Sequence, residues 1–374
     1  MKFSVNNQDI LKALQTVSRA ISSKTSMPIL ECVYLEAKDK FLYLKGSNTE
    51  LSIISKIPAA VSEPGKVVIP IKTITNILRT YPDELVLFTV NEQNVTNINC
   101  QGTDLKSDIS ILGRNALEYP KIDTYKQDES FLRIEHQVLK NMIKDTVFAC
   151  AYSEGVSPIL TGVLVEYEKK LLHFTALDGY KLAVRQEVVE GENDQKISCI
   201  VPGKTLSEIL KILAIYEYDT YICINGEKFI VNIGDTQIIS NILEGDFIQY
   251  QSMIPSDINT IVKAETKELL KSIERASLIT DVTRNSLVRM DVSDNMICIT
   301  SESDIGKVVE NVNVSKNGAD LKIAFNSKYL IEILKIIDDE RIIIECKNEL
   351  SPTLIKPVDS DDFLYLIMPV RYVE

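Results

Sequence analysis

The pattern of hydrophobic and polar residues predicts helices alternating with strands along the whole chain. Near the start, apolar residues such as Ile10, Leu14 and Val17 recur at three- and four-residue spacing, which is typical of a helix with one buried face. Residues 33–38 then alternate between apolar and polar, and a polar turn separates them from a second run over 41–45. This pattern indicates a β-hairpin. The chain is therefore predicted to be α+β.

The pattern repeats three times. The run over residues 68–78 is echoed at 200–210 and again at 325–334. Pairs of leucine and lysine at 11–12, 139–140 and 270–271 recur at a similar spacing, close to one third of the 374 residues. When the runs that end at residues 78, 210 and 334 are aligned on their closing Ile-Leu, each has a lysine at the same position: Lys72, Lys204 and Lys328.

We therefore predict three copies of one domain, over residues 1–122, 128–253 and 254–374, joined by segments rich in turn residues. Each copy is expected to hold two amphipathic helices. With their flanking residues these helices cover 6–24, 71–81, 135–149, 203–216, 263–280 and 326–337.

Charge is distributed unevenly between these helices and the rest of the chain. The helices hold 15 of the 41 Lys and Arg residues but 8 of the 53 Asp and Glu residues, although the whole chain has a net charge of −12. A basic face on an acidic body would suit sequence-independent contact with duplex phosphates. Fourteen basic residues could contribute to it: Lys12, Arg19, Lys24, Lys72, Arg79, Lys140, Lys144, Lys204, Lys211, Lys267, Lys271, Arg275, Lys328 and Lys335.

Composition narrows the class of protein. With 45% hydrophobic and 25% charged residues, the chain should fold throughout. Its 7 cysteines are widely spaced and include no Cys-x-x-Cys pair, which favours reduced thiols over a disulfide framework or a zinc site. The start lacks the apolar core of a signal peptide, and no apolar run is long enough to span a membrane. We expect a soluble cytoplasmic protein with no membrane partner.

Residues able to carry out catalysis are scarce. His136 and His173 lie far from any Cys, Asp or Glu at ligand spacing, and both are better explained as structural residues. The run 203–205 resembles the end of a phosphate-binding loop, but the glycine that this motif requires earlier is replaced by Ser198. The acidic residues over 359–362 fit a solvated loop better than a metal site. We predict no catalytic residue, cofactor or metal.

Several segments together carry a family resemblance. They are residues 1–3, 176–184, 200–202, 243–247 with Tyr250, 325–326 and 367–371. In these segments the chain resembles the bacterial β sliding clamp, the processivity subunit of DNA polymerase III. The resemblance implies a head-to-tail ring of two subunits, with helices inside, antiparallel sheets outside and duplex DNA through the hole. It also implies a nucleoid-associated protein that a clamp loader, DNA polymerases and repair proteins bind through short peptides.

The resemblance suggests which residues face DNA and which form the subunit interface. Lys24 matches a loop residue that contacts DNA in the family, whereas Lys72, Arg79, Lys204 and Lys328 follow from the helix pattern. At the interface, Ile109 and Ile111 are expected to meet Leu278 and Ile279 of the other subunit, with Lys106, Glu274 and Asp281 able to add ion pairs at the rim.

The family has a peptide-binding cleft between its second and third domains. The matching apolar floor here is Leu160, Leu177, Leu182, Leu350, Ile355, Leu366 and Ile367, followed by Met368, Pro369, Val370 and Arg371 of the C-terminal segment. Met253 is expected to form a flexible wall. Three positions depart from the family pattern: Tyr180 stands for the usual His, Lys181 for Arg and Ile248 for Pro.

Two other functions remain open at this point. One is a nucleotide-dependent enzyme that uses Gly203-Lys204-Thr205, and the other is a repeat scaffold that binds proteins alone. The lysine repeated at one register favours the DNA clamp over both.

Overall fold

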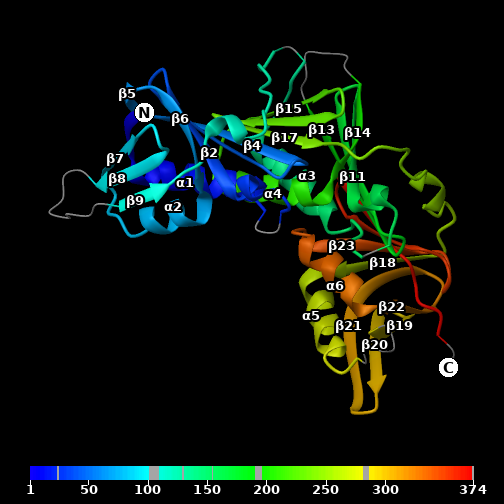
Figure 1. Cartoon of the computed structure of the whole chain (residues 1–374). Helices are drawn as coiled ribbons and strands as arrows, with labels where there is room; N and C mark the ends of the chain where they lie inside the picture. Colours follow the sequence, from blue (N-terminus) through cyan, green and yellow to red (C-terminus); the bar gives the residue numbers. More distant parts are fainter. Residues whose placement is uncertain are drawn as a thin grey trace. The chain divides into compact units, whose positions relative to one another are not determined.

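The computed structural model describes residues 1–22, 25–100, 109–128, 130–153, 155–189, 196–280 and 286–372. Along the chain, one order of elements occurs three times (Figure 1). Each copy has a strand, a helix, four or five strands that lead to a second helix, and three closing strands. The prediction of three tandem α+β copies is confirmed.

The elements of the first copy are β1 (Lys2–Asn6), α1 (Asn7–Val17), β2 (Cys32–Lys38), β3 (Phe41–Ser47), β4 (Leu51–Pro58), β5 (Ala60–Glu63), β6 (Gly65–Pro70), α2 (Ile71–Leu78), β7 (Leu85–Val90), β8 (Val95–Cys100) and β9 (Ile109–Leu112). Those of the second copy are β10 (Leu132–Ile134), α3 (His136–Val147), β11 (Gly162–Glu168), β12 (Leu171–Leu177), β13 (Lys181–Val188), β14 (Ile197–Pro202), α4 (Gly203–Leu213), β15 (Thr220–Asn225), β16 (Lys228–Ile233) and β17 (Thr236–Asn241). Those of the third copy are β18 (Thr260–Glu265), α5 (Thr266–Ser277), β19 (Leu287–Ser293), β20 (Met296–Ser303), β21 (Gly306–Gly318), β22 (Leu321–Asn326), α6 (Ser327–Ile336), β23 (Arg341–Cys346), β24 (Thr353–Pro357) and β25 (Phe363–Ile367).

All six predicted helices are present, each inside its predicted range. Every helix follows directly on a strand, with no more than one residue between them. In α2, α4 and α6, the lysine identified by the repeat is the second residue of the helix. The repeated sequence pattern therefore corresponds to one repeated structural feature.

The residues form two compact units, 1–136 with 208–242 and 137–207 with 243–374, so the second copy contributes to both. The first unit contains a five-stranded sheet, ordered β5-β1-β7-β8-β9, and an eight-stranded sheet, ordered β10-β15-β16-β17-β4-β3-β2-β6. The second unit contains a twelve-stranded sheet, ordered β14-β11-β12-β13-β25-β24-β23-β18-β21-β20-β19-β22.

Both of the larger sheets run from one copy into the next. In the first unit, β4 pairs antiparallel with β17, and Ile53 lies opposite Ile238. In the second unit, β13 pairs antiparallel with β25, and Ala183 lies opposite Tyr365. We call these two ladders the first junction and the second junction. Backbone hydrogen bonds thus join successive copies.

The core of each unit lies between helices and sheets. The helix faces predicted to be buried are buried, including Ile10, Leu14 and Val17 of α1. All seven cysteines lie in the described part of the chain and are free thiols. No helix among the described residues is long and apolar enough to cross a membrane.

Candidate functional site

A tight turn at the end of the β12–β13 hairpin shapes one edge of the second junction. The carboxylate of Asp178 accepts hydrogen bonds from the backbone N–H groups of Tyr180 and Lys181, each at 2.9 Å. Gly179 has a φ of +91°, a conformation that favours glycine. The turn brings Leu177 opposite Leu182 at the end of the ladder. Two leucines are thereby fixed side by side.

These leucines belong to an apolar cluster on one face of the second junction. Leu177, Leu182 and Leu366 are buried together with Leu354 and Tyr250. The partly buried residues that pack against them are Leu160, Val184, Phe247, Ile254, Ile258 and Leu364. The structure thus brings together four leucines that the sequence predicts for the cleft, and it adds Leu354, Tyr250 and Phe247. We call this set the leucine cluster.

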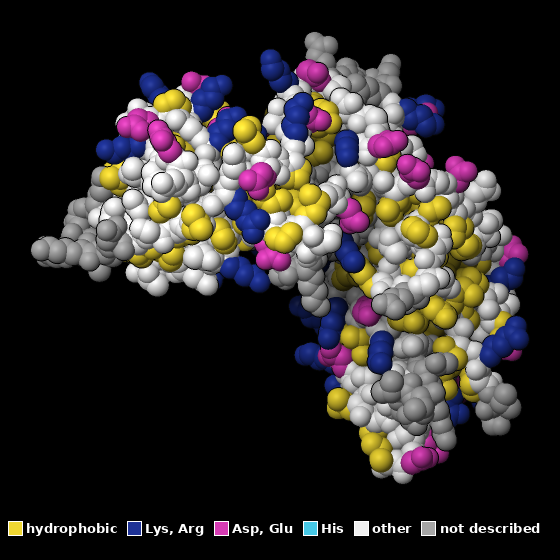
Figure 2. Space-filling view, in the orientation of Figure 1, with side chains coloured by type: hydrophobic (Ala, Val, Ile, Leu, Met, Phe, Trp, Pro, Cys, Tyr) yellow, Lys and Arg dark blue, Asp and Glu magenta, His cyan; other side chains and the backbone are white. Residues whose placement is uncertain are grey.

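Several exposed apolar side chains lie close in sequence to members of the leucine cluster. Ile248 and Met253 flank Tyr250, Leu350 precedes β24, and Met368 follows β25, and all four are exposed. Figure 2 shows hydrophobic side chains gathered on this unit, around the region where Figure 1 labels β11 and β18. Grouped exposed apolar residues of this kind mark interaction sites in soluble proteins.

Two backbone hydrogen bonds hold the C-terminal segment against the rest of this unit. The N–H of Met368 donates to the carbonyl oxygen of Tyr180 at 2.8 Å, and the N–H of Val370 donates to that of Ala324 at 2.8 Å. Pro369 is half-buried and Arg371 is exposed. These two hydrogen bonds fix the course of the segment beside the turn.

Ile355 and Ile367 correct the predicted floor. Leu182 and Leu366 are cross-strand neighbours, as are Leu366 and Leu354, and so they share one face of the sheet. Since successive side chains alternate between faces, Ile355 and Ile367 point to the opposite face, where both are fully buried. We therefore exclude them from the cleft.

Lys181 also lies on the opposite face, across the ladder from Ile367. Its side chain is 6% exposed and forms ion pairs with Asp178, at 3.7 Å, and with Glu332. Its ammonium group lies 5.2 Å from the centre of the Tyr329 ring. With its charge held by these partners, Lys181 has a structural role. The exposed Tyr180 stacks on Tyr329, with ring centres 5.6 Å apart.

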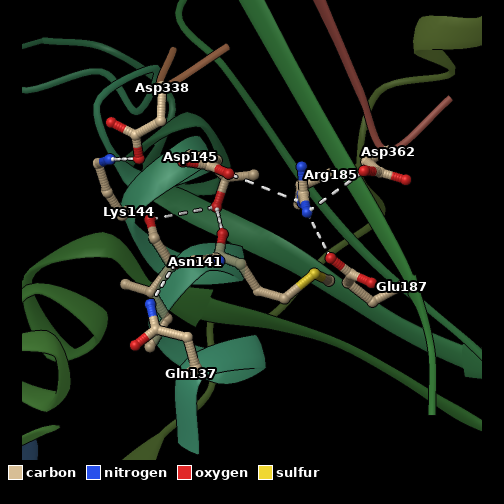
Figure 3. Close-up of polar contacts among 11 residues, drawn as sticks. Gln137, Asn141, Lys144, Asp145, Arg185, Glu187, Asp338 and Asp362 are labelled. Carbon is tan, nitrogen blue, oxygen red and sulfur yellow. Dashed lines mark hydrogen bonds and ion pairs between the residues drawn. The ribbon is translucent and has the colours of Figure 1, made fainter. Parts of the chain in front are cut away.

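An ionic cluster supports the second junction on its helix side (Figure 3). Arg185 of β13 lies 3.7 Å from Asp145 of α3 and 3.9 Å from Asp362, and it also pairs with Glu187. Burial raises the pKa of Asp145 to about 6, and this effect exceeds the opposing attraction of Arg185. Nearby, Lys144 donates to Asp338 at 2.7 Å.

The three repeated lysines are exposed at the starts of their helices. Within the described ranges, Lys72, Lys204 and Lys328 have no acidic partner. Several other predicted basic residues do: Arg19 and Lys211 pair with Glu208, Lys144 with Asp338, Arg275 with Glu310, and Lys335 with Glu274. Arg79 is exposed at the end of α2. Lys24 lies outside the described residues.

The residues predicted for the subunit interface are unevenly exposed. Ile111 is buried, and Ile109 and Ile279 are half-buried, whereas Leu278 is 80% exposed at the end of α5. Glu274 forms an ion pair with Lys335 within the chain. Lys106 and Asp281 lie outside the described residues.

The glycine of the run resembling a phosphate-binding loop has a packing role. A Cβ atom at Gly203 would approach the Sγ of Cys150 to 2.9 Å and the carbonyl oxygen of Thr161 to 3.0 Å. The glycine therefore permits close packing at the start of α4. His136 bonds through Nε2 to the carbonyl oxygen of Leu213 at 2.7 Å. Among the residues that the structure describes, no group of three His, Cys, Asp or Glu could hold a metal ion.

Comparison with domain families gives three matches in order along the chain. They are the N-terminal domain of the DNA polymerase III beta subunit over residues 1–123, the central domain over 133–249 and the C-terminal domain over 251–371.

Full-length relatives and solved structures agree with these matches. A beta sliding clamp of Staphylococcus epidermidis is 32% identical over 381 residues, which cover 99% of each chain. A crystal structure of the DNA polymerase sliding clamp from Bacillus subtilis has a TM-score of 0.95 and 31% identity, with 100% of both chains covered. The beta subunit of the DNA polymerase of Streptococcus pyogenes has a TM-score of 0.93 and 28% identity, again with 100% of both chains covered.

Proposed function

Because this chain belongs to the family of bacterial beta sliding clamps, the beta subunits of DNA polymerase III, we propose that two copies close head to tail into a ring around duplex DNA. The ring would tether the replicative polymerase and other replication and repair proteins without catalysing a reaction itself. The observation that carries this proposal is a junction that one chain leaves incomplete.

Each junction joins the third strand after the first helix of one copy to the last strand of the next copy. The first junction uses β4 and β17, and the second uses β13 and β25. The third strand of the third copy is β21, whose residues 306–313 pair, within the described part of the chain, with β20 alone, since β18 pairs with residues 314–318. The last strand of the first copy is β9, which is the edge of its sheet. A second copy of the chain would supply the missing partner for each. We call this pairing the third junction.

The in-chain junctions also predict the register of the third. Ile53, Ala183 and Val308 hold the same hairpin position, opposite Gly46, Ala176 and Ser301. The last strands can be aligned in the same way. Starting in the strand before each copy's first helix, and following the paired residues across the sheet, one reaches Ile109 in the first copy, Ile238 in the second and Tyr365 in the third. Because Ile53 pairs with Ile238 and Ala183 with Tyr365, Val308 should pair with Ile109.

Burial supports this register. The four residues at the equivalent positions of the in-chain junctions are buried, whereas Val308 and Ile109 are half-buried in the single chain. Leu278, at the end of α5, and Ile305, directly before β21, are 80% and 81% exposed. An aliphatic surface with an unpaired strand edge is what an obligate subunit interface covers.

The repeated lysines support contact with DNA. A lysine in the first turn opposes the helix macrodipole, which favours negative charge there, and α2, α4 and α6 have no acidic residue in that turn. Helix stability therefore does not explain the repetition. A lysine without an acidic partner at a helix start, where the macrodipole is positive, suits a phosphate. Three such positions in each chain would hold DNA weakly and without sequence preference, as sliding requires.

The leucine cluster and its exposed neighbours support docking of a partner peptide. Buried leucines give an apolar floor, and Met253 and Met368 are flexible side chains that can adapt to different partners. Tyr180 extends the apolar edge, since its ring is exposed and held by Tyr329. We propose that short peptides ending in a Leu-Phe pair bind here.

Retention on DNA tests the proposed ring. The protein is loaded onto nicked circular plasmid with a clamp loader and ATP, the plasmid is then linearised, and release is followed by gel filtration. A ring that encircles DNA is retained on the circle and released from the linear molecule. Retention on both forms would instead show direct gripping, and it would contradict the proposal.

A further inference from the structure

The face of the first junction that points away from the helices contains a cavity of about 780 Å³. Its base is formed by β2, β3 and β4, and one wall is the segment 124–127. This volume lies within the range that binds small ligands or part of a peptide. The cavity belongs entirely to the first unit and is separate from the leucine cluster.

The cavity is positively charged in a chain of net charge −12. Its lining includes four lysines but two acidic residues, Glu36 and Asp235. Glu36 is shared, because it lies 3.7 Å from Lys45 and 3.2 Å from Lys66. The lysines that line the cavity are Lys38, Lys45, Lys56 and Lys126. Lys56 lies 3.5 Å from Asp235, and Lys38 lies 3.5 Å from Asp39, which is not part of the lining. The four lysines outnumber the two carboxylates of the lining, and among the described residues Lys126 has no acidic partner.

Two of these lysines are held in place before any ligand binds. The ammonium group of Lys45 lies 5.1 Å from the centre of the Tyr34 ring, and that of Lys56 lies 4.0 Å from the centre of the Phe41 ring. Their side chains are 19% and 33% exposed. Partly desolvated and preorganised cations attract an anion more strongly than lysines that move freely in water.

The wall of the cavity is fixed as well. The N–H of Tyr125 donates to Oε1 of Gln237 at 2.9 Å, and Nε2 of Gln237 donates to the carbonyl oxygen of Tyr125 at 2.8 Å. The same nitrogen donates to Oδ1 of Asn232 at 2.9 Å. These amides are engaged by the protein itself, so they are poorly placed to read the edges of a nucleobase.

The spacing of the lysines points to an extended ligand. Lys56 pairs across the ladder with Tyr43, two residues from Lys45, so the two lysines are diagonal neighbours whose Cα atoms lie about 7–8 Å apart. In an extended peptide, alternate side chains on one face recur at about 6.8 Å. We propose that this cavity binds an acidic, extended peptide segment of a partner protein, with carboxylates at alternate positions.

The direct test uses a fluorescein-labelled peptide of alternating glutamate and serine and the full-length protein. Saturable binding with a Kd below about 100 μM is expected, and it should weaken as salt is added. The Lys56→Gln, Lys126→Gln double variant should bind the peptide at least about tenfold more weakly, since each lysine donates to a ligand carboxylate. The Lys169→Gln, Lys170→Gln double variant removes the same charge from the turn between β11 and β12 and should bind as the wild type does.

Three outcomes would overturn the proposal. They are no saturable binding, an equal weakening in both double variants, or displacement of the peptide by ATP at lower concentration than by unlabelled peptide. A Leu-Phe peptide that occupies the leucine cluster should not compete. This site is independent of the proposed ring, because binding here is measured without DNA and without a clamp loader.

Discussion

The first and second junctions have the same backbone pairing, but their side chains differ in chemistry on both faces of the sheet. At the end of the first, Ser47 lies opposite Ser52, and their hydroxyls are 2.8 Å apart. At the same place in the second, Leu177 lies opposite Leu182. A polar pair in one copy thus corresponds to the apolar pair that starts the leucine cluster in the other.

The helix side shows the reverse trend. In the first junction, neutral hydroxyls meet: Ser55 with Thr236 at 3.3 Å, and Thr16 with Tyr216 at 3.2 Å. In the second junction, Arg185 occupies the ladder position of Ser55 and lies among acidic residues. The backbone ladder tolerates either solution. Side chains therefore decide what each junction binds and how it responds to pH.

Extending the comparison to the third junction gives the largest expected effect. Ile111→Asp with Leu278→Asp should weaken the dimer by at least about 1,000-fold, because two charges would replace aliphatic side chains in a buried interface. Sedimentation should then show monomers. Leu278→Asp alone leaves folding intact, because that side chain is exposed, and should already weaken the dimer. Val188→Asp, also at an exposed position, is the matched control for Leu278→Asp. A double variant that remains dimeric would contradict the interface.

Exchanging the end pairs of the two junctions tests the leucine cluster. Leu177→Ser with Leu182→Ser should weaken binding of a Leu-Phe peptide about 100-fold, since the peptide would bury its apolar side chains against hydroxyls instead of leucines. Fluorescence anisotropy measures the affinity, and circular dichroism checks folding. Ser47→Leu with Ser52→Leu makes the opposite change at the first junction and should leave affinity unchanged.

A milder variant avoids most of the change in the core. Met368→Ala with Leu177→Ala should weaken the same peptide about tenfold while the ring remains assembled. Unchanged affinity in this variant would exclude the leucine cluster as the peptide site.

The ionic cluster should make the second junction sensitive to pH. Burial raises the pKa of Asp145 from 3.8 to about 6, so the folded state binds more protons than the unfolded state between these values. The contribution of Asp145 to the free energy of unfolding should therefore fall as pH rises from 4 to 6.5, by about 2–3 kcal/mol. Asp145→Asn should remove this fall and be the more stable form at pH 8, as measured by urea denaturation.

The first junction supplies the control for this pH effect. Ser55→Ala should lower the free energy of unfolding by about 1 kcal/mol at every pH, since the hydroxyls there do not titrate. A pH-dependent effect of Ser55→Ala, or a pH dependence that persists in Asp145→Asn, would assign the effect to other groups.

The smallest effect is expected for a feature that the copies share. Lys72→Gln, Lys204→Gln and Lys328→Gln together should reduce the dependence of direct DNA binding on the logarithm of salt concentration by about 0.9 for each phosphate that a lysine no longer neutralises. Retention on nicked circles should change less than about twofold, because encirclement holds the ring. Lys2→Gln, Lys169→Gln and Lys170→Gln form the matched control. An unchanged salt dependence would show that the repeated lysines do not face DNA.

Much of the fold could be predicted from the sequence because its signals are local. The six helices follow from apolar spacing, and the repeat shows that they belong to three copies. The ladders that join the copies could not be predicted in this way. They pair residues as distant as Ile53 and Ile238, and no periodicity within either strand specifies its partner.

The cleft shows a similar limit. The leucines of the hairpin can be assigned because the turn between them is marked by Asp178 and Gly179. The prediction puts Ile355 and Ile367 on the wrong face because their strands, β24 and β25, are apolar on both sides. Where both faces of a sheet are covered, alternation no longer distinguishes them. The neighbouring Leu354 escapes sequence-based assignment for the same reason.

The continuity of the sheets across the in-chain junctions has a consequence for how the proposed ring opens. A polypeptide tether keeps both strands of each in-chain junction at an effective concentration in the millimolar range or above, so a broken ladder re-forms at once. The third junction has no tether, so its closure depends on the concentration of free subunits. Dilution, force or a loading machine would therefore act on the third junction, while the first and second junctions stay paired.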